Sequence, residues 1–242
     1  MQLRILHRSF RPRGWAFALA VAACAAGIVL GNWQFGRAEE KRNLAARLEA
    51  ALAGPTRGLP ARPIAASEYA MTRVAAQGEF LPQHTVLLDN RIREGRAGFE
   101  VVTPLRLAQG DLHVLVNRGW IAAPAPRSTV PQVRTPAGVQ RIEGLALERL
   151  PRAYEPSGYE PRGNVLQNLR LEEYRAASGL TLQPIVIEQL SGTDDGLARV
   201  WPRPDAGIEK HEMYALQWYS LAVLAVVLFL VLSFRHEKPA AR

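Results

Sequence analysis

The chain has 242 residues, a formal net charge of +8 and one cysteine, Cys24. A single cysteine excludes an intrachain disulfide, and the lack of CxxC and CxxCH motifs disfavours thiol redox chemistry, covalent haem attachment and cysteine-rich metal centres. The five histidines form no tight ligand cluster, and no basic helix with interleaved aromatics indicates nucleic-acid binding.

The first predicted element is a transmembrane helix at residues 14–35, an uncharged block that follows an arginine-rich N-terminus, residues 1–13. As a helix this block is about 33 Å long, enough to cross the hydrocarbon core of a bilayer. Residues 21–24 (VAAC) resemble a lipoprotein cleavage box, which is the alternative reading. The apolar run continues well past Cys24, however, and therefore favours an uncleaved anchor. Gly27 and Gly31 form a GxxxG pattern, which permits close packing against another helix.

A membrane-proximal helix and a linker are expected at residues 36–67. The sequence AEEKRNLAARLEAALA is rich in strong helix formers, and Gly54 and Pro55 directly follow it as a stop signal. The segment GPTRGLPARP then reads as a linker.

The middle of the chain, residues 68–208, is predicted to be a β-rich exported domain. Short apolar runs alternate there with turn residues, which indicates an antiparallel sheet or a small barrel. The runs are residues 71–80, 85–91, 99–107, 112–121, 139–147, 164–169 and 182–190. A tight hairpin is expected at residues 109–111 and a looser connection at 94–98, and residues 171–179 read as a helix that ends at Gly179.

A second transmembrane helix with an interfacial start is predicted at residues 209–234, followed by a basic tail at 235–242. Basic residues flank both outer ends, so the positive-inside rule places both termini in the cytoplasm and the middle outside the cell inner (plasma) membrane. The predicted fold class is a membrane protein with two transmembrane α-helices flanking a mainly antiparallel β (α+β) exported domain.

Several polar residues inside the predicted strands are candidates for a pocket or a partner surface. They are Asp89, Arg91, Asn117, Arg118 and Trp120. Asp89 and Arg91 are two residues apart, which predicts a shared face of their strand. The alternative is that these groups form buried pairs that hold the sheet together, and this structural reading is favoured. No nucleophile elbow, phosphate-binding loop, dinucleotide fingerprint or HExxH motif occurs, so no catalytic residue is predicted.

The start of the second apolar helix carries a possible ligand site at His211. On a helical projection, His211 shares a face with Tyr214, Trp218, two alanines and Phe229. The small residues leave room for a flat apolar ligand, or for close packing against Gly27 and Gly31. Neutral imidazole is a common haem-iron ligand. The alternative is that His211 and its aromatic neighbours only anchor the helix end among lipid headgroups.

Four sequence blocks together resemble the Surfeit locus protein 1 family of cytochrome c oxidase assembly factors, and the likeness runs almost end to end. The blocks are GNWQFGR at 31–37, LDNR at 88–91 with GFEVVTPL at 98–105, VNRGWI at 116–121, and HEMYALQWY at 211–219. One departure is that Glu209 and Lys210 stand where the family pattern has asparagines. The short, positively charged N-terminus is typical of a bacterial member.

The resemblance implies a non-enzymatic chaperone that assists haem a insertion into the oxidase catalytic subunit. It implies haem a as a transient cofactor with His211 as axial ligand, next to Tyr214 and Trp218, and Arg37 is a candidate partner for a haem propionate. The implied partners are the catalytic subunit, the haem a synthase as a second candidate, and membrane lipid. Two alternatives remain: a scaffold that stabilises an oxidase intermediate without binding haem, and an unrelated membrane-anchored ligand-binding domain.

Overall fold

The computed structural model describes residues 8–10, 12–108, 110–126, 129–202 and 207–236. The chain divides into two compact units, Met1–Ala46 with Arg203–Arg242, and Arg47–Pro202. The predicted fold class is confirmed, because two helices long and apolar enough to cross a membrane flank a mainly antiparallel β domain in the sequence. The β-rich unit begins before residue 68, the expected start of the domain, because it includes the last turns of the first helix.

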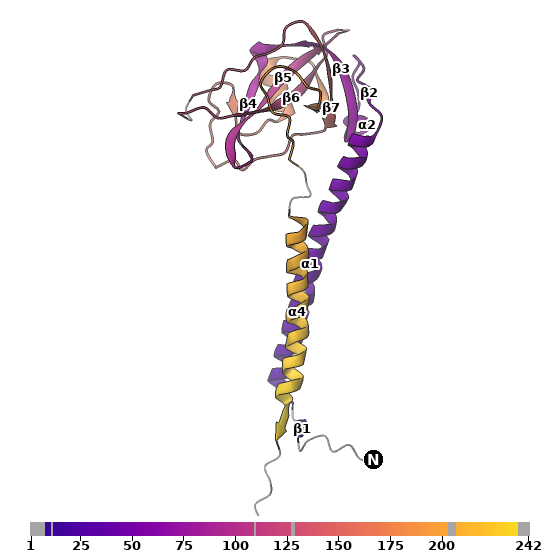
Figure 1. Cartoon of the computed structure of the whole chain (residues 1–242), viewed down its shortest axis with the longest axis vertical. Coiled ribbons are helices and arrows are strands. Elements are labelled where there is room, and N and C mark those ends of the chain that lie inside the picture. The colour runs from indigo at the N-terminus through magenta and orange to yellow at the C-terminus, as the bar shows by residue number, and fades with distance from the viewer. Residues whose placement is uncertain (1–7, 11, 109, 127–128, 203–206, 237–242) are drawn as a thin grey trace, which may run out of the picture. The chain divides into compact units, whose positions relative to one another are not determined.

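The first unit is an antiparallel pair of long helices, α1 (Gly14–Ala53) and α4 (Ile208–Ser233), which run alongside each other in Figure 1. Two short strands, β1 (Arg8–Phe10) and β10 (Phe234–His236), pair antiparallel beyond the helix ends. Helix α1 continues without a break from its apolar part into its charged part and ends at Ala53, directly before Gly54 and Pro55. Neither a glycine at this position nor a following proline favours another helical turn.

The second unit is built from strands with three short helical segments. The strands are β2 (Arg57–Gly58), β3 (Thr72–Phe80), β4 (Val86–Arg93), β5 (Arg96–Leu107), β6 (His113–Ala122), β7 (Val139–Leu147), β8 (Val165–Leu166) and β9 (Leu182–Gln189). The helical segments are α2 (Ala66–Tyr69), the 3-10 turn η1 (Pro82–His84) and α3 (Leu171–Ser178). Helix α3 ends at Gly179, whose φ of +69° is the left-handed conformation that favours glycine at a helix end.

Five of these strands close into a barrel in the order β3, β7, β9, β6, β5 and back to β3. The closure occurs at the end of β3, where Gly78–Phe80 pairs with Leu105–Leu107 of β5. A Cβ on Gly78 would meet the carbonyl oxygen of Arg106, so the close approach of the two backbones requires glycine there. Most pairs are antiparallel, whereas β6 and β9 run parallel.

Side chains on the two faces of the strands contribute to three hydrophobic clusters. All five barrel strands contribute to the interior cluster, which includes Val74, Leu105, Val114, Ile142 and Ile187. The intervening residues point outward, where Leu88, Val102, Leu115 and Val186 pack beneath Tyr174 of α3. This period of two is the geometry of a β-strand, in which successive side chains point to opposite faces.

Two local expectations differ from the structure. The connection between β4 and β5 is not loose, because only Glu94 and Gly95 separate the strands and both have positive φ, the pattern of a tight two-residue hairpin turn. The segment 164–169 forms a strand only at Val165–Leu166, which pairs parallel with β4. Of the expected hairpin at 109–111, residue 109 lies outside the described residues, and β5 and β6 on either side pair antiparallel.

Candidate functional site

Small residues bring α1 and α4 into close contact. A Cβ added to Gly27 would lie 2.8 Å from the carbonyl oxygen of Trp218 and 2.9 Å from Cβ of Ala222. A Cβ added to Gly31 would overlap the ring of Tyr219. At Ala222 the small-residue stripe of α4 is therefore packed closely against α1.

Polar contacts at one end of the helix pair fix the rotation and register of the two helices. Nδ1 of His211 lies 2.7 Å from Oε1 of Gln34. The Tyr219 hydroxyl donates to Oδ1 of Asn32 at 2.8 Å. Arg42 forms an ion pair with Glu212. Three independent contacts between residues far apart in the sequence hold the His211 ring at a defined place on α1.

The His211 side chain is half-buried, and its second ring nitrogen, Nε2, has no hydrogen-bond partner within the described residues. An imidazole with one nitrogen held and the other unengaged is the arrangement of a metal-ligating histidine. These residues therefore fit a haem iron, which takes histidine as an axial ligand in many proteins.

The other residues predicted for this site differ in their exposure and in their contacts. Tyr214, one turn along α4, is 42% exposed, and the Lys210 ammonium lies 6.0 Å from its ring centroid. Trp218 is half-buried, and its backbone carbonyl faces Gly27. Arg37 pairs with Glu40 at 2.8 Å on an exposed surface, and within the described part of the chain no contact joins Arg37 to His211.

In the barrel, three of the five predicted polar residues meet in one buried cluster around Glu100. Its carboxylate accepts a hydrogen bond from Nδ2 of Asn117 at 3.1 Å, lies 3.6 Å from Nε of Arg91, and pairs with Arg93. The indole of Trp120 donates to the backbone oxygen of Arg91 at 2.7 Å. Burial lowers the pKa of Arg91, and the negative charge of Glu100 opposes this effect.

Asp89 does not join this cluster. The pairing of β4 with β5 shifts between Leu88 and Arg91, and Asn90 has a φ of +58°. One inserted residue moves the following side chains to the other face of the strand. The prediction that Asp89 and Arg91 share a face is therefore wrong: Arg91 reaches Glu100, whereas Asp89 lies 3.9 Å from Arg162.

Arg118 makes a separate, fully buried set of contacts. Its guanidinium donates to Oδ2 of Asp195 at 3.0 Å, to Oγ1 of Thr135 at 2.9 Å and to the backbone oxygen of Arg134 at 2.7 Å. Arg199 donates to the same carboxylate oxygen at 2.7 Å. Burial lowers the pKa of Arg118, and the hydrogen bond to Asp195 counters it. These contacts fasten two long loops to the barrel, which supports the structural reading of the motif at 116–121.

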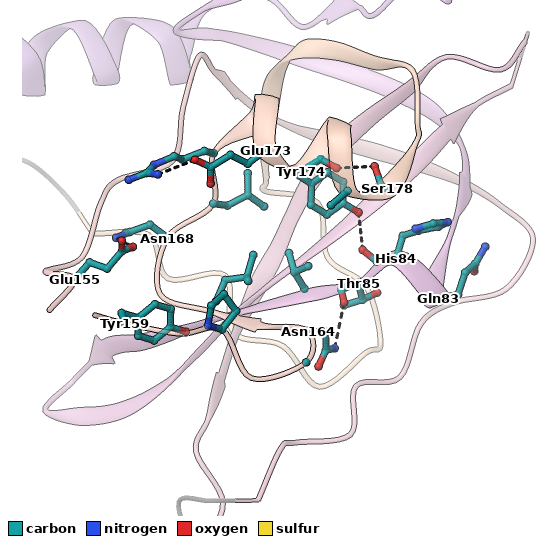
Figure 2. Close-up of a pocket in the computed structure, with 17 residues that line it drawn as sticks. Gln83, His84, Thr85, Glu155, Tyr159, Asn164, Asn168, Glu173, Tyr174 and Ser178 are labelled. Atoms are coloured by element: carbon teal, nitrogen blue, oxygen red, sulfur yellow. Dashed lines mark hydrogen bonds and ion pairs between the residues drawn. The ribbon is translucent and has the colours of Figure 1, made fainter. Parts of the chain in front are cut away.

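The barrel unit also holds a surface cavity of about 540 Å³ beside α3, shown in Figure 2. The polar groups around it are largely used within the chain: the Tyr174 hydroxyl donates to the backbone oxygen of His84 at 2.6 Å, and Asn164 donates to that of Thr85 at 3.1 Å. Burial raises the pKa of Tyr174 above its usual range. The cavity therefore lies among contacts that tie α3 and the loop before β8 to the start of β4.

Sequence reasoning missed the partners that complete these clusters. Gln34 lies inside a quoted motif, but its partner is 177 residues away. Glu100 and Asp195 were not selected either, because the sequence does not show which distant arginine or amide a carboxylate will contact. Glu188, opposite Asn117 in the pairing of β6 with β9, is a further buried carboxyl. Its position in an otherwise apolar strand was the available signal.

Comparisons with known proteins agree over most of the chain. The sequence model of the SURF1 family matches residues 20–223. A SURF1-like protein of Monosiga brevicollis is 29% identical over 219 residues, which cover 84% of this chain and 82% of the relative. One from Rickettsia conorii is 26% identical over 215 residues, 86% of this chain and 87% of the relative. An uncharacterized SURF1-like protein of Mycobacterium tuberculosis is 27% identical over 230 residues, 90% and 82% of the two chains.

Proposed function

The chain belongs to the SURF1 family, and from this premise we propose that it is a membrane-anchored assembly factor for cytochrome c oxidase that assists haem a insertion into the catalytic subunit. The proposal combines the family membership with the site at the start of α4. It needs no catalytic residue, because holding and delivering a cofactor requires binding groups and no chemical step.

We propose that α1 and α4 anchor the chain in the inner membrane with both termini in the cytoplasm and the barrel on the outer side. Each helix has an apolar stretch long enough to span a bilayer. Arginines precede the first span and follow the second, which favours this orientation.

The observation that carries the haem proposal is the half-buried His211 imidazole, held at Nδ1 by Gln34 with Nε2 unengaged within the described residues. Haem a, when bound, supplies the iron that this imidazole ligates. Tyr214 and Trp218 continue the same helix face and offer aromatic contact to a flat apolar ligand. The exposed ion pair of Arg37 with Glu40 is weak, so the Arg37 guanidinium is available to a propionate.

The barrel is proposed to dock on the oxidase catalytic subunit, with the haem a synthase as a second candidate partner. Buried hydrogen bonds engage the side chains of Arg91, Asn117 and Arg118. We therefore assign these residues to stabilising the barrel and not to binding a partner protein. We therefore expect the exposed surface of the barrel unit to contact the oxidase catalytic subunit.

A scaffold that stabilises an oxidase intermediate without binding haem is the second candidate. The specific observation in its favour is that α1 packs directly against Ala222 and Tyr219 of α4, so this part of the helix face is occupied by protein. Both functions need the barrel and the helix pair, and they differ in the role of His211.

The two candidates are separated by purifying the full chain from cells that coexpress the haem a synthesis enzymes and recording its absorption spectrum. We expect a haem a spectrum that His211→Ala abolishes. His84→Ala is the matched histidine control, because the Tyr174 hydroxyl contacts only its backbone oxygen, and it should keep full haem content. A wild-type chain without haem a, from a gene whose deletion still blocks oxidase assembly, would favour the scaffold. Equal haem content in wild type and His211→Ala would remove His211 as the ligand.

A further inference from the structure

We propose that Gln34 is a positioning residue for His211: its side-chain oxygen accepts a hydrogen bond from Nδ1–H and keeps the imidazole in the tautomer whose Nε2 lone pair points to a ligand. The effect of Gln34 on haem a binding rests on the proposed function. The position of the proton on the His211 imidazole in the haem-free protein does not depend on that function.

The hydrogen-bond chemistry assigns the proton. A neutral imidazole carries one N–H and one lone pair, and a side-chain amide oxygen only accepts. With Oε1 of Gln34 2.7 Å from Nδ1, the proton lies on Nδ1 and the lone pair on Nε2. An amide turned by half a rotation would instead donate to Nδ1 and force the proton onto Nε2, where it would block a metal. The orientation of one amide therefore decides whether His211 can ligate iron.

The surrounding helix packing holds Gln34 in place. Three residues before it, Gly31 lies against the Tyr219 ring, and Asn32 accepts from the Tyr219 hydroxyl at 2.8 Å. Two turns after it, Arg42 pairs with Glu212, the neighbour of His211. The contact between Gln34 and His211 lies between the contacts of Asn32 with Tyr219 and of Arg42 with Glu212. The packing of the two helices therefore restricts the position of the Gln34 amide relative to the His211 ring.

The location of the hydrogen bond between Gln34 and His211 increases its strength. Gln34 lies at the end of the apolar part of α1, before the first charged residue, Arg37, and both side chains are part-buried. A hydrogen bond with reduced competition from water is stronger, and an acceptor on one imidazole nitrogen raises the basicity of the other. Gln34 thus orients the ring and strengthens its Nε2 as a ligand. Removal of such an outer partner weakens metal affinity by about 10- to 100-fold.

The first arm of the test uses the chain without haem. The full chain with ¹⁵N-labelled histidine is studied by NMR in detergent, at a pH where His211 is neutral. The wild type should carry its proton on Nδ1, and Gln34→Leu should shift the population toward Nε2. The matched comparison is Asn32→Leu, which removes the hydrogen bond from Tyr219 but keeps the Gln34 amide, and it should change the His211 tautomer less than Gln34→Leu does. A wild-type proton on Nε2, or the same tautomer in Gln34→Leu, overturns the inference.

The second arm measures binding of haem a to the same proteins. Gln34→Leu should bind about 10- to 100-fold more weakly. Gln34→Glu should keep His211 ligation and lower the reduction potential, because a carboxylate accepts more strongly from Nδ1–H. Asn32→Leu should weaken binding less than Gln34→Leu does, because it leaves the acceptor of the Nδ1–H in place. Equal losses in Gln34→Leu and Asn32→Leu would assign the effect to helix packing and overturn the positioning role.

The two arms separate failure of this inference from failure of the proposed function. A wild-type chain that binds no haem a contradicts the proposed function, while the tautomer measured in the first arm still decides the role of Gln34. Haem binding that His211→Ala abolishes and Gln34→Leu leaves intact contradicts the inference alone.

Discussion

At the scale of single residues, a buried row of polar side chains crosses three neighbouring strands of the barrel: Glu100 on β5, Asn117 on β6 and Glu188 on β9. Asn117 donates to Glu100, and its own side-chain oxygen has no partner within the described residues. Burial raises the pKa of Glu188 to about 7, the charge of Glu100 adds to this, and Arg93 counters it. A protonated Glu188 carries an O–H donor, the kind of group that the unpartnered Oδ1 of the neighbouring Asn117 requires.

The raised pKa of Glu188 makes stability depend on pH. The folded chain keeps a proton that the unfolded chain releases near the ordinary pKa of 4.5, so the free energy of unfolding falls as pH rises from there to about 7 and then levels. Glu188→Gln should remove this slope, equal the wild type at pH 4, and exceed it at pH 8 by up to about 3 kcal/mol. The measurement is urea denaturation of the detergent-solubilised chain, followed by circular dichroism at both pH values.

The exposed Glu160→Gln serves as the control for this measurement and should keep the wild-type slope. The assignment to Glu188 is wrong if Glu188→Gln and wild type show the same pH dependence.

At the scale of elements, the contact between α1 and α4 depends on two glycines one turn apart. Gly27 faces Trp218 and Ala222 at distances that leave no room for a side chain, whereas Gly36, further along the same helix, has no atom within 4 Å of an added Cβ. The helices therefore associate on one face of α1 only, and that face also presents Gln34 to His211.

Gly27→Leu should separate the helices and destabilise their association by about 1–3 kcal/mol, the usual cost of overpacking. SDS titration of the full chain, followed by helical circular dichroism, measures this as a lower transition midpoint. Gly36→Leu is the matched control and should leave the midpoint unchanged within error. Equal shifts in the two variants would contradict a specific helix–helix contact at Gly27.

At the scale of the whole molecule, the proposed arrangement in the membrane has both termini in the cytoplasm and the barrel outside. We expect Ser157→Cys, in an exposed loop of the barrel and in a Cys24→Ser background, to react with a membrane-impermeant maleimide in spheroplasts. A cysteine added after Arg242 should react only after permeabilisation. The opposite labelling pattern would place the termini outside and refute the orientation inferred from the basic flanks.

The sequence by itself determined the features that depend on neighbouring residues. The lengths of the two uncharged blocks predicted both apolar helices, and the short apolar runs between turn residues predicted where most strands lie. Gly54 with Pro55, and Gly179, marked where helices end. These signals are local because helix and strand periods, helix stops and membrane-spanning length are properties of short segments.

Only the tertiary structure decided which distant segments meet. Barrel closure between β3 and β5, the parallel pairing of β6 with β9, and the contacts of Arg118 with Asp195 join parts of the chain that no local period relates. The bulge at Asn90 placed Arg91 on the opposite face of the strand from Asp89. At the candidate site, a helical projection selected His211, but its partner Gln34 comes from the other helix. Which side chain reaches a given ring is set by the packing of two helices, and that packing depends on Gly27 and Gly31 together with Ala222 and Tyr219.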